Sequence, residues 1–186
     1  MTRPRLLIAG IGNIFFGDDA FGVEVAQRLA QRQMPQEVRV IDFGIRGIDL
    51  TYALLDGYEF VILVDALPRG GTPGRLYVLE PDFADNTEYS DAGTLIEMHR
   101  LDPVRVLHLA AEMGARVKCL LLVGCEPETS GNDEGMQDGL SDIVRLAVDQ
   151  AIPLIESLAA RLLRDEEFAS MENPVLSLKE IAPCRD

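Results

Sequence analysis

Residues 60–65 read Phe-Val-Ile-Leu-Val-Asp, five apolar residues followed by one carboxylate. An apolar run without interruption is typical of a central strand in a parallel sheet, because helices cover both faces of such a strand. Shorter apolar or β-branched runs at 5–9, 38–42 and 117–123 predict three more strands. The four runs together predict the framework of a parallel sheet.

Stretches with helical periodicity alternate with these strands. Residues 20–32 carry Phe21, Val25 and Leu29 at intervals of four, which places them on one face of a helix. Further helices are expected at 47–55, 103–113 and 141–164, and a short strand at 75–79. This order predicts the α/β class, as a three-layer sandwich with a mostly parallel twisted sheet.

The length of 186 residues predicts one domain. We expect residues 1–165 to form this single α/β domain. We expect residues 166–186 to be a loosely held C-terminal tail.

The composition argues against two classes of partner and favours one compartment. The formal net charge of −14 repels phosphate backbones, so no nucleic-acid partner is expected. No apolar run approaches the ~20 residues that span a bilayer, and Asn13 interrupts the stretch 6–16 that imitates a signal peptide, so no membrane association is expected. Three cysteines without a CxxC pair predict a reducing compartment, the cytoplasm.

Three side chains that can bind a cation are predicted at one edge of the sheet. Ligands of open α/β sheets bind beyond the carboxyl ends of the strands, and Asp65 stands at such an end. Asp19 directly precedes a predicted helix, and His99 lies shortly before another. Two carboxylates and one imidazole would suit a divalent cation such as Ni²⁺ or Zn²⁺.

Structural roles for the same carboxylates remain open. Asp18 or Asp19 could be the N-cap of the helix that follows, and Asp65 could accept hydrogen bonds from loop amides. His108 is expected at the edge of the core, and Cys125 is expected to be an ordinary small thiol. The chain has no HExxH motif, so an ordinary zinc protease is disfavoured.

A nucleotide site is the main alternative from the residues themselves. Residues 10–13 read Gly-Ile-Gly-Asn, which begins like a dinucleotide-binding fingerprint, and Asp42 mimics a ribose-binding acid. However, Phe15 replaces the third glycine, and Asp18 and Asp19 stand where a pyrophosphate would need backbone donors. A Rossmann-like nucleotide or small-ligand binding domain therefore stays an alternative.

Four blocks of the sequence, in this order, resemble the nickel–iron hydrogenase maturation endopeptidases. Residues 10–23 are similar to the family's opening G-x-G-N-x-x-x-x-D-[DE]-x-x-G block, and residues 64–66 to a second block. His99 matches a third, and the turn 124–128, followed by 139–141, a fourth. The resemblance covers residues 5 to about 163.

The resemblance implies a phosphorylase/hydrolase-like version of this sandwich fold. It also implies an endopeptidase that removes the C-terminal extension of a hydrogenase large-subunit precursor after nickel insertion. It implies metal contact and catalysis through Asp19, Asp65 and His99, with Asp42 as a candidate general base or substrate-holding residue. The nickel would be that of the substrate, and no tightly bound cofactor of the protein's own is expected. A metal-binding maturation chaperone without hydrolysis is a further alternative.

One segment departs from the family pattern. Residues 42–47 read Asp-Phe-Gly-Ile-Arg-Gly and are similar to the family's D-G-G-T-x-G segment. Phe43 replaces a glycine and Ile45 a threonine. This departure bears on substrate recognition near that loop and leaves the metal-contacting residues in place.

Overall fold

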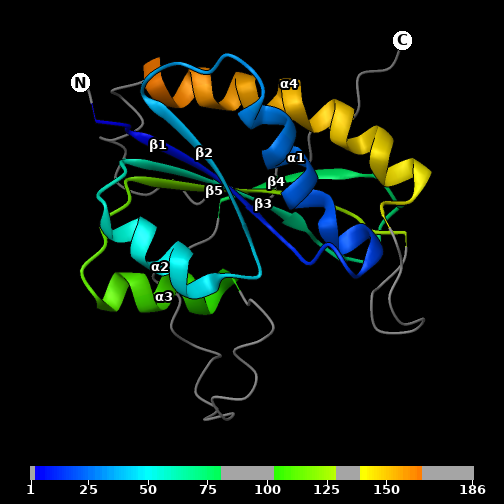
Figure 1. The fold of residues 1–186 in the computed structure, drawn as a ribbon, viewed down its shortest axis with the longest axis horizontal. Coiled ribbons are helices and arrows are strands. Elements are labelled where there is room, and N and C mark those ends of the chain that lie inside the picture. The colour runs from blue at the N-terminus through cyan, green and yellow to red at the C-terminus, as the bar shows by residue number, and fades with distance from the viewer. Residues whose placement is uncertain (1–2, 81–102, 129–138, 165–186) are drawn as a thin grey trace.

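The computed structural model describes residues 3–80, 103–128 and 139–164. Five strands form one sheet in the order β2-β1-β3-β5-β4 (Figure 1). Four of them run parallel, and β4 pairs antiparallel with β5 at one edge. The strands are β1 Leu6–Ile11, β2 Val38–Gly44, β3 Phe60–Ala66, β4 Leu76–Leu79 and β5 Cys119–Cys125.

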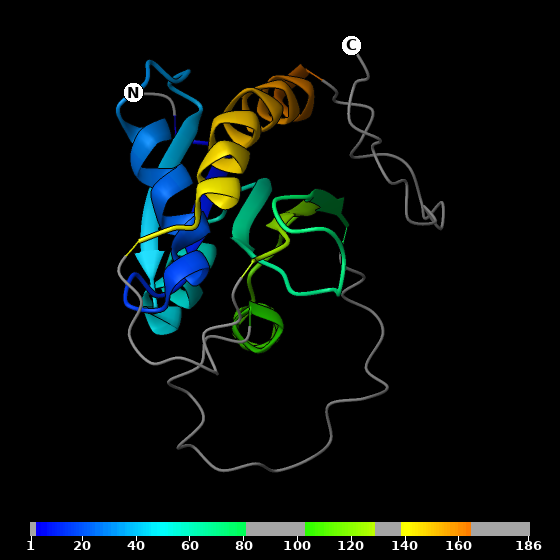
Figure 2. The same ribbon diagram turned by 90° about the vertical axis from the view of Figure 1, so that its right-hand side faces the viewer.

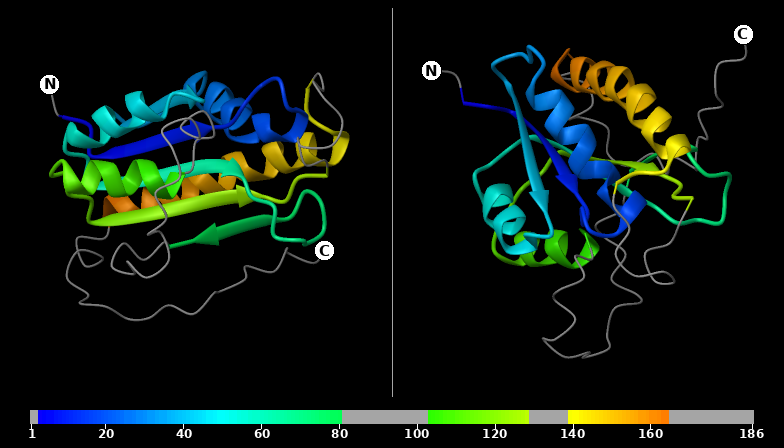
Figure 3. Two further views of the ribbon diagram at one scale, coloured as in Figure 1. Left: turned by 90° about the horizontal axis from the view of Figure 1, so that it is seen from below. Right: turned by 45° about the vertical axis from the view of Figure 1, so that its right-hand side comes forward.

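The helices lie in two layers, one on each face of the sheet. They are the 3-10 helix η1 Gly17–Ala20, α1 Phe21–Ala30, α2 Gly47–Leu55, α3 Pro103–Glu112 and α4 Asp142–Arg164. Helices α1 and α4 lie side by side on one face, and α2 and α3 lie side by side on the other (Figure 3, right). Figure 2 shows α4 and α3 on opposite sides of the sheet. The expected three-layer sandwich is confirmed.

The central strand β3 is apolar throughout because it has a hydrophobic core on both faces. Phe60, Ile62 and Val64 pack with α1 and α4, whereas Val61 and Leu63 pack with α2 and α3. All five side chains are at most 1% exposed. Burying each side chain of this kind stabilises the fold by roughly 1.5–3 kcal/mol.

The parallel strands extend past the ends of the apolar runs that predict them. Strand β1 continues to Ile11, β2 to Gly44, β3 to Ala66 and β5 to Cys125. The ladder between parallel strands uses main-chain groups, so it continues through glycine and aspartate residues that the apolar pattern excludes. Asp42 and Asp65 therefore lie inside their strands, which continue beyond them to Gly44 and Ala66.

Two glycines let η1 and α1 press directly onto the sheet. A Cβ at Gly22 would lie 2.0 Å from the carbonyl oxygen of Val64, and a Cβ at Gly12 would lie 1.8 Å from that of Asp19. Gly12 also has a φ of +135°, which disfavours any side chain. The glycines of the opening motif thus allow close backbone packing around the carboxyl ends of β1 and β3.

Several expectations concern residues outside the described ranges. His99 and the tail 166–186 are among them. The proposed boundary of the domain at residue 165 stays a prediction. No helix in the described part of the chain has the length and apolarity needed to cross a bilayer.

Candidate active site

Asp65 and Asp19 lie near each other at the carboxyl edge of the sheet. Asp65 is the next-to-last residue of β3, and Asp19 belongs to η1, which packs against that strand. Burial of the carboxylate, followed by the negative charge of Asp19, raises the pKa of Asp65 to about 8. The structure therefore brings together two of the three predicted metal-contacting residues.

The surroundings of Asp65 supply little to stabilise its negative charge. The amide of Ala66 donates a hydrogen bond of 2.8 Å to the carboxylate, which only partly offsets the effect of burial. Among the residues that the structure describes, no Lys or Arg forms an ion pair with Asp65. A bound cation would stabilise the ionised form, because opposite charge within a few ångströms lowers a carboxyl pKa.

Asp19 is fixed by the loop that follows β1. The amide of Asn13 donates a hydrogen bond of 2.8 Å to the Asp19 carboxylate. The same loop is closed on itself, because the amide of Phe15 donates to the Asn13 side chain at 3.0 Å. The amide that would have to face a pyrophosphate in a nucleotide site is thus directed at a carboxylate. This arrangement weighs against the nucleotide-binding alternative.

Asp18 and Asp19 do not cap a helix with their side chains, so that structural expectation is wrong. The N-cap residues are Phe16 for η1 and Ala20 for α1, and neither helix has a side-chain cap hydrogen bond. Both aspartates lie inside η1 itself, beyond the N-cap position. The 3-10 turn before α1 was not evident from the sequence, and it shifts the two carboxylates away from the capping geometry.

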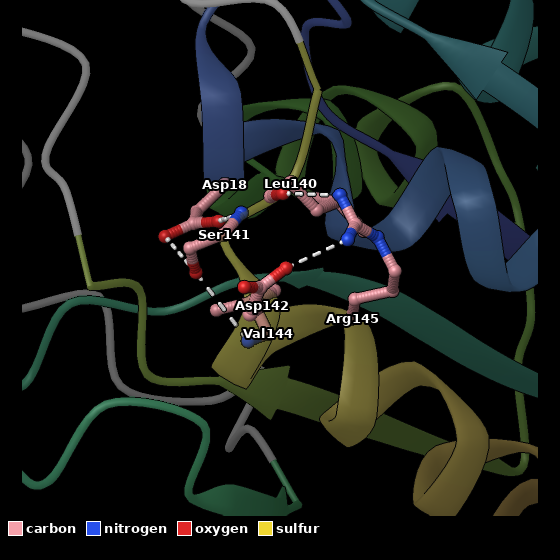
Figure 4. A network of polar contacts seen from close by, with 6 residues as sticks. All are labelled: Asp18, Leu140, Ser141, Asp142, Val144 and Arg145. Atoms are coloured by element: carbon pink, nitrogen blue, oxygen red, sulfur yellow. Dashed lines mark hydrogen bonds and ion pairs between the residues drawn. The ribbon is translucent and has the colours of Figure 1, made fainter.

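Asp18 has a role that sequence reasoning missed. Its side chain is fully buried and accepts hydrogen bonds from the amide of Glu128 at 2.9 Å and from that of Ser141 at 2.7 Å. The Ser141 hydroxyl donates a third, at 3.0 Å (Figure 4). A buried carboxylate is stable only when such donors replace water. Two of the three donors are main-chain amides far along the chain, which leave no signature in the sequence.

Asp42 lies at the same edge of the sheet as Asp65, but its side chain is on the other face. Its carboxylate accepts a hydrogen bond of 3.0 Å from the Gln27 side chain on α1. Side chains alternate along a strand, so Asp42 shares the α1 face with Val38 and Val40. The same alternation places Asp65 on the face of Val61 and Leu63. The alternation thus places the side chains of Asp42 and Asp65 on opposite faces of the sheet.

The two departures from the family pattern have different surroundings. Phe43 is 4% exposed and packs in the core beneath α2, against residues such as Leu50 and Leu54. Ile45 is 55% exposed and follows Gly44, whose φ is +55°. Phe43 is therefore a core residue of this chain, whereas Ile45 is available for contact at the surface.

The remaining candidates behave as expected where they are described. His108 is partly buried on α3, consistent with the edge of the core. Cys125 is buried, and burial, followed by the charges of Asp18 and Glu126, raises the pKa of its thiol to about 12. A thiol with such a pKa is not an activated nucleophile. Cys119 is also a buried thiol.

The third predicted metal-contacting residue, His99, lies outside the described residues. Within residues 3–80, 103–128 and 139–164, no group of three His, Cys, Asp or Glu side chains could hold a metal ion. The described part of the site thus consists of two nearby carboxylates, held by the loop after β1 and by the end of β3. Carboxylates are ligands for divalent cations, so the donor set present fits a cation that has further ligands elsewhere.

Comparisons with known proteins agree on one family. Residues 23–158 match the family model for hydrogenase maturation protease. The chain is 34% identical over 163 residues to the hydrogenase expression/formation protein HoxM of Azotobacter vinelandii, covering 87% of this chain and 75% of that one. It is 33% identical over 160 residues to a putative hydrogenase maturation protease of Methanocaldococcus jannaschii, covering 83% and 96%.

A solved structure supports the same conclusion at the level of the fold. The hydrogenase maturating endopeptidase HybD from E. coli superposes with a TM-score of 0.65 and 26% sequence identity. The match covers 85% of this chain and 93% of HybD.

Proposed function

The chain belongs to the hydrogenase maturation protease family, and from this premise we propose that it removes the C-terminal extension of a nickel–iron hydrogenase large-subunit precursor after nickel insertion. Its substrate is a protein that carries its own nickel. The two buried free thiols, Cys119 and Cys125, support a reducing compartment, so the proposed location is the cytoplasm.

One observation carries the proposal beyond family membership. Asp65 is held next to Asp19 in surroundings that raise its pKa to about 8, through burial first and the charge of Asp19 second. Such a carboxylate is costly to keep ionised until a cation arrives. A nickel ion presented by the substrate would supply that positive charge, and the pair would then recognise the loaded precursor.

This arrangement supports the roles of Asp19 and Asp65, whereas the role of His99, which lies outside the described residues, comes from the sequence resemblance. We assign Asp19 and Asp65 as oxygen ligands and His99 as the nitrogen ligand to the nickel of the substrate. The bound metal supplies Lewis-acid chemistry to the scissile peptide or to a water molecule. Asp42, held by Gln27 on the α1 face, is assigned to the substrate chain or to proton transfer rather than to the metal. No tightly bound cofactor of the protein's own is needed.

The test is cleavage of a purified precursor with and without nickel. We expect wild-type protein to shorten the nickel-loaded large subunit and to leave the nickel-free precursor uncut. Equal cleavage of both precursors would overturn recognition through the metal. Binding of the loaded precursor without shortening it would favour the chaperone alternative.

A matched pair of histidine variants tests the third ligand. His99→Ala removes the proposed nitrogen ligand and should lose processing, whereas His108→Ala should keep most of it. The melting temperature of each variant is recorded alongside. An active His99→Ala variant beside a folded but inactive His108→Ala variant would show that the wrong histidine has been assigned.

A further inference from the structure

We propose that Asp18 is a positioning residue for the processing reaction, because its buried carboxylate ties η1 to the segment after β5 and to the residue before α4, and so holds Asp19 beside Asp65. The inference rests on the proposed function, since it concerns the geometry of the same site. It assigns no contact between Asp18 and the substrate.

The contacts of Asp18 come from two segments on the far side of η1. One carboxylate oxygen accepts from the amide of Ser141 at 2.7 Å. The other accepts from the amide of Glu128 at 2.9 Å and from the Ser141 hydroxyl at 3.0 Å. Glu128 follows β5, and Ser141 directly precedes α4. A single side chain therefore joins η1 to the segment after β5 and to the start of α4.

Ser141 carries this connection into α4. Its hydroxyl donates to Asp18 and also lies 3.4 Å from the amide of Val144, which donates to it as in an N-cap (Figure 4). Any movement of η1 would therefore disturb the first turn of α4. Because Val144 is fully buried in the core, that turn is itself rigidly placed.

The opposite side of η1 is fixed through Asp19. The amide of Asn13 donates to the Asp19 carboxylate, and Gly12 has no Cβ to obstruct the Asp19 carbonyl. The four-residue helix η1 is thus held between β1 and α4 by two adjacent aspartates. Losing the Asp18 contacts would remove the hydrogen bonds that join η1 to Glu128 and Ser141. Misplacing a catalytic group by about 1 Å can cost about a hundredfold in rate.

Asp18→Asn is the direct test, because it preserves the volume of the side chain and removes its charge. An amide NH₂ would face at least one of the donors that now point at a carboxylate oxygen. We expect kcat/KM for the nickel-loaded precursor to fall about tenfold, as for the loss of a hydrogen bond to a charged group. The matched control is Asp142→Asn, an exposed aspartate of the same region that binds Arg145 and does not contact Asp18 (Figure 4). It should stay within about twofold of wild type.

A double-mutant cycle separates positioning from general structural loss. If Asp18 acts through Asp19, then Asp18→Asn should lower the activity of wild type but not that of Asp19→Asn, because the group it positions has already been lost. The rates are measured with enzyme in large excess, so that slow variants still give a product. Additive losses in the double variant would overturn the positioning role, as would unchanged activity of Asp18→Asn.

Two other results can be told apart from a failure of the Asp18 proposal: an Asp18→Asn variant that does not fold, and an Asp19 residue that has no role in cleavage. Ser141→Ala removes one donor to Asp18 and keeps the Ser141 amide, so it replaces Asp18→Asn in the same cycle if the latter does not fold. Coupling of Ser141→Ala to Asp19→Asn then supports the proposal, and additivity overturns it. If Asp19→Asn cuts as fast as wild type, the proposed role of Asp19 itself has failed, whatever Asp18 does.

Discussion

The two ends of strand β3 carry carboxylates in opposite electrostatic settings. Glu59 directly precedes the strand and accepts hydrogen bonds from Arg5 at 2.7 Å and Lys118 at 2.7 Å. These contacts hold the pKa of Glu59 at about 2. Asp65, near the other end, has its pKa raised to about 8 by burial and by Asp19.

The difference separates an edge of the sheet that stabilises the fold from the edge where we propose that a ligand binds. One charged residue directly precedes each of three neighbouring strands: Arg5 before β1, Glu59 before β3 and Lys118 before β5. Opposite charges therefore lie next to each other at the amino edge of the sheet. The carboxyl edge instead places two carboxylates near each other. An arrangement that costs stability in the free protein is typical of a functional site.

The largest expected effect compares the two carboxylates in the processing assay. Asp65→Ala should lower cleavage of the nickel-loaded precursor by about a hundredfold or more, because it removes a ligand from the metal. Glu59→Ala should stay within about threefold of wild type, because Glu59 lies at the opposite edge. Rates are measured from the appearance of the shortened subunit. Similar losses in both variants would mean that the two edges do not differ in function.

A second comparison concerns stability and should separate it from activity. The folded pKa of Asp65 lies above its ordinary value of 3.8, so the cost of burying its charge is absent below pH ~4 and grows as the pH rises toward 8. Asp65→Asn removes this cost and should raise stability at pH 7 by up to about 4 kcal/mol, while processing is lost. Urea unfolding of both proteins at several pH values measures the difference. A variant that is less stable than wild type at pH 7 would contradict the interpretation.

The smallest expected effect is at the amino edge. The folded pKa of Glu59 lies below its ordinary value of 4.5, so its contribution to stability is complete above pH ~4.5 and is lost as the pH falls toward 2. Glu59→Gln should therefore destabilise the protein by about 1 kcal/mol at pH 7, after allowance for solvent screening of a side chain that is 30% exposed. The gap between the two unfolding curves should close in acid. A gap that persists at low pH would point to packing rather than charge.

The helices and strands could largely be predicted because their signals are local. The apolar run at 60–64 predicted β3, and the segment 47–55 coincides with α2. The 3-10 turn η1 was missed because its four residues are too few to show a period. The carboxyl ends of the strands were placed too early, since the main-chain ladder continues through Gly44 and Ala66 without regard to side chains.

The sequence by itself determined the α/β architecture, the family and the position of Asp65 at a strand's carboxyl end, because periodicity, motif order and the geometry of parallel sheets depend on residue types alone. Only the tertiary structure decided that Asp18 joins η1 to Glu128 and Ser141, and that Asp42 and Asp65 occupy different faces. The physical reason is that main-chain amides from distant segments donate to Asp18. Every residue except proline has such an amide, so folding rather than residue identity selects the donors.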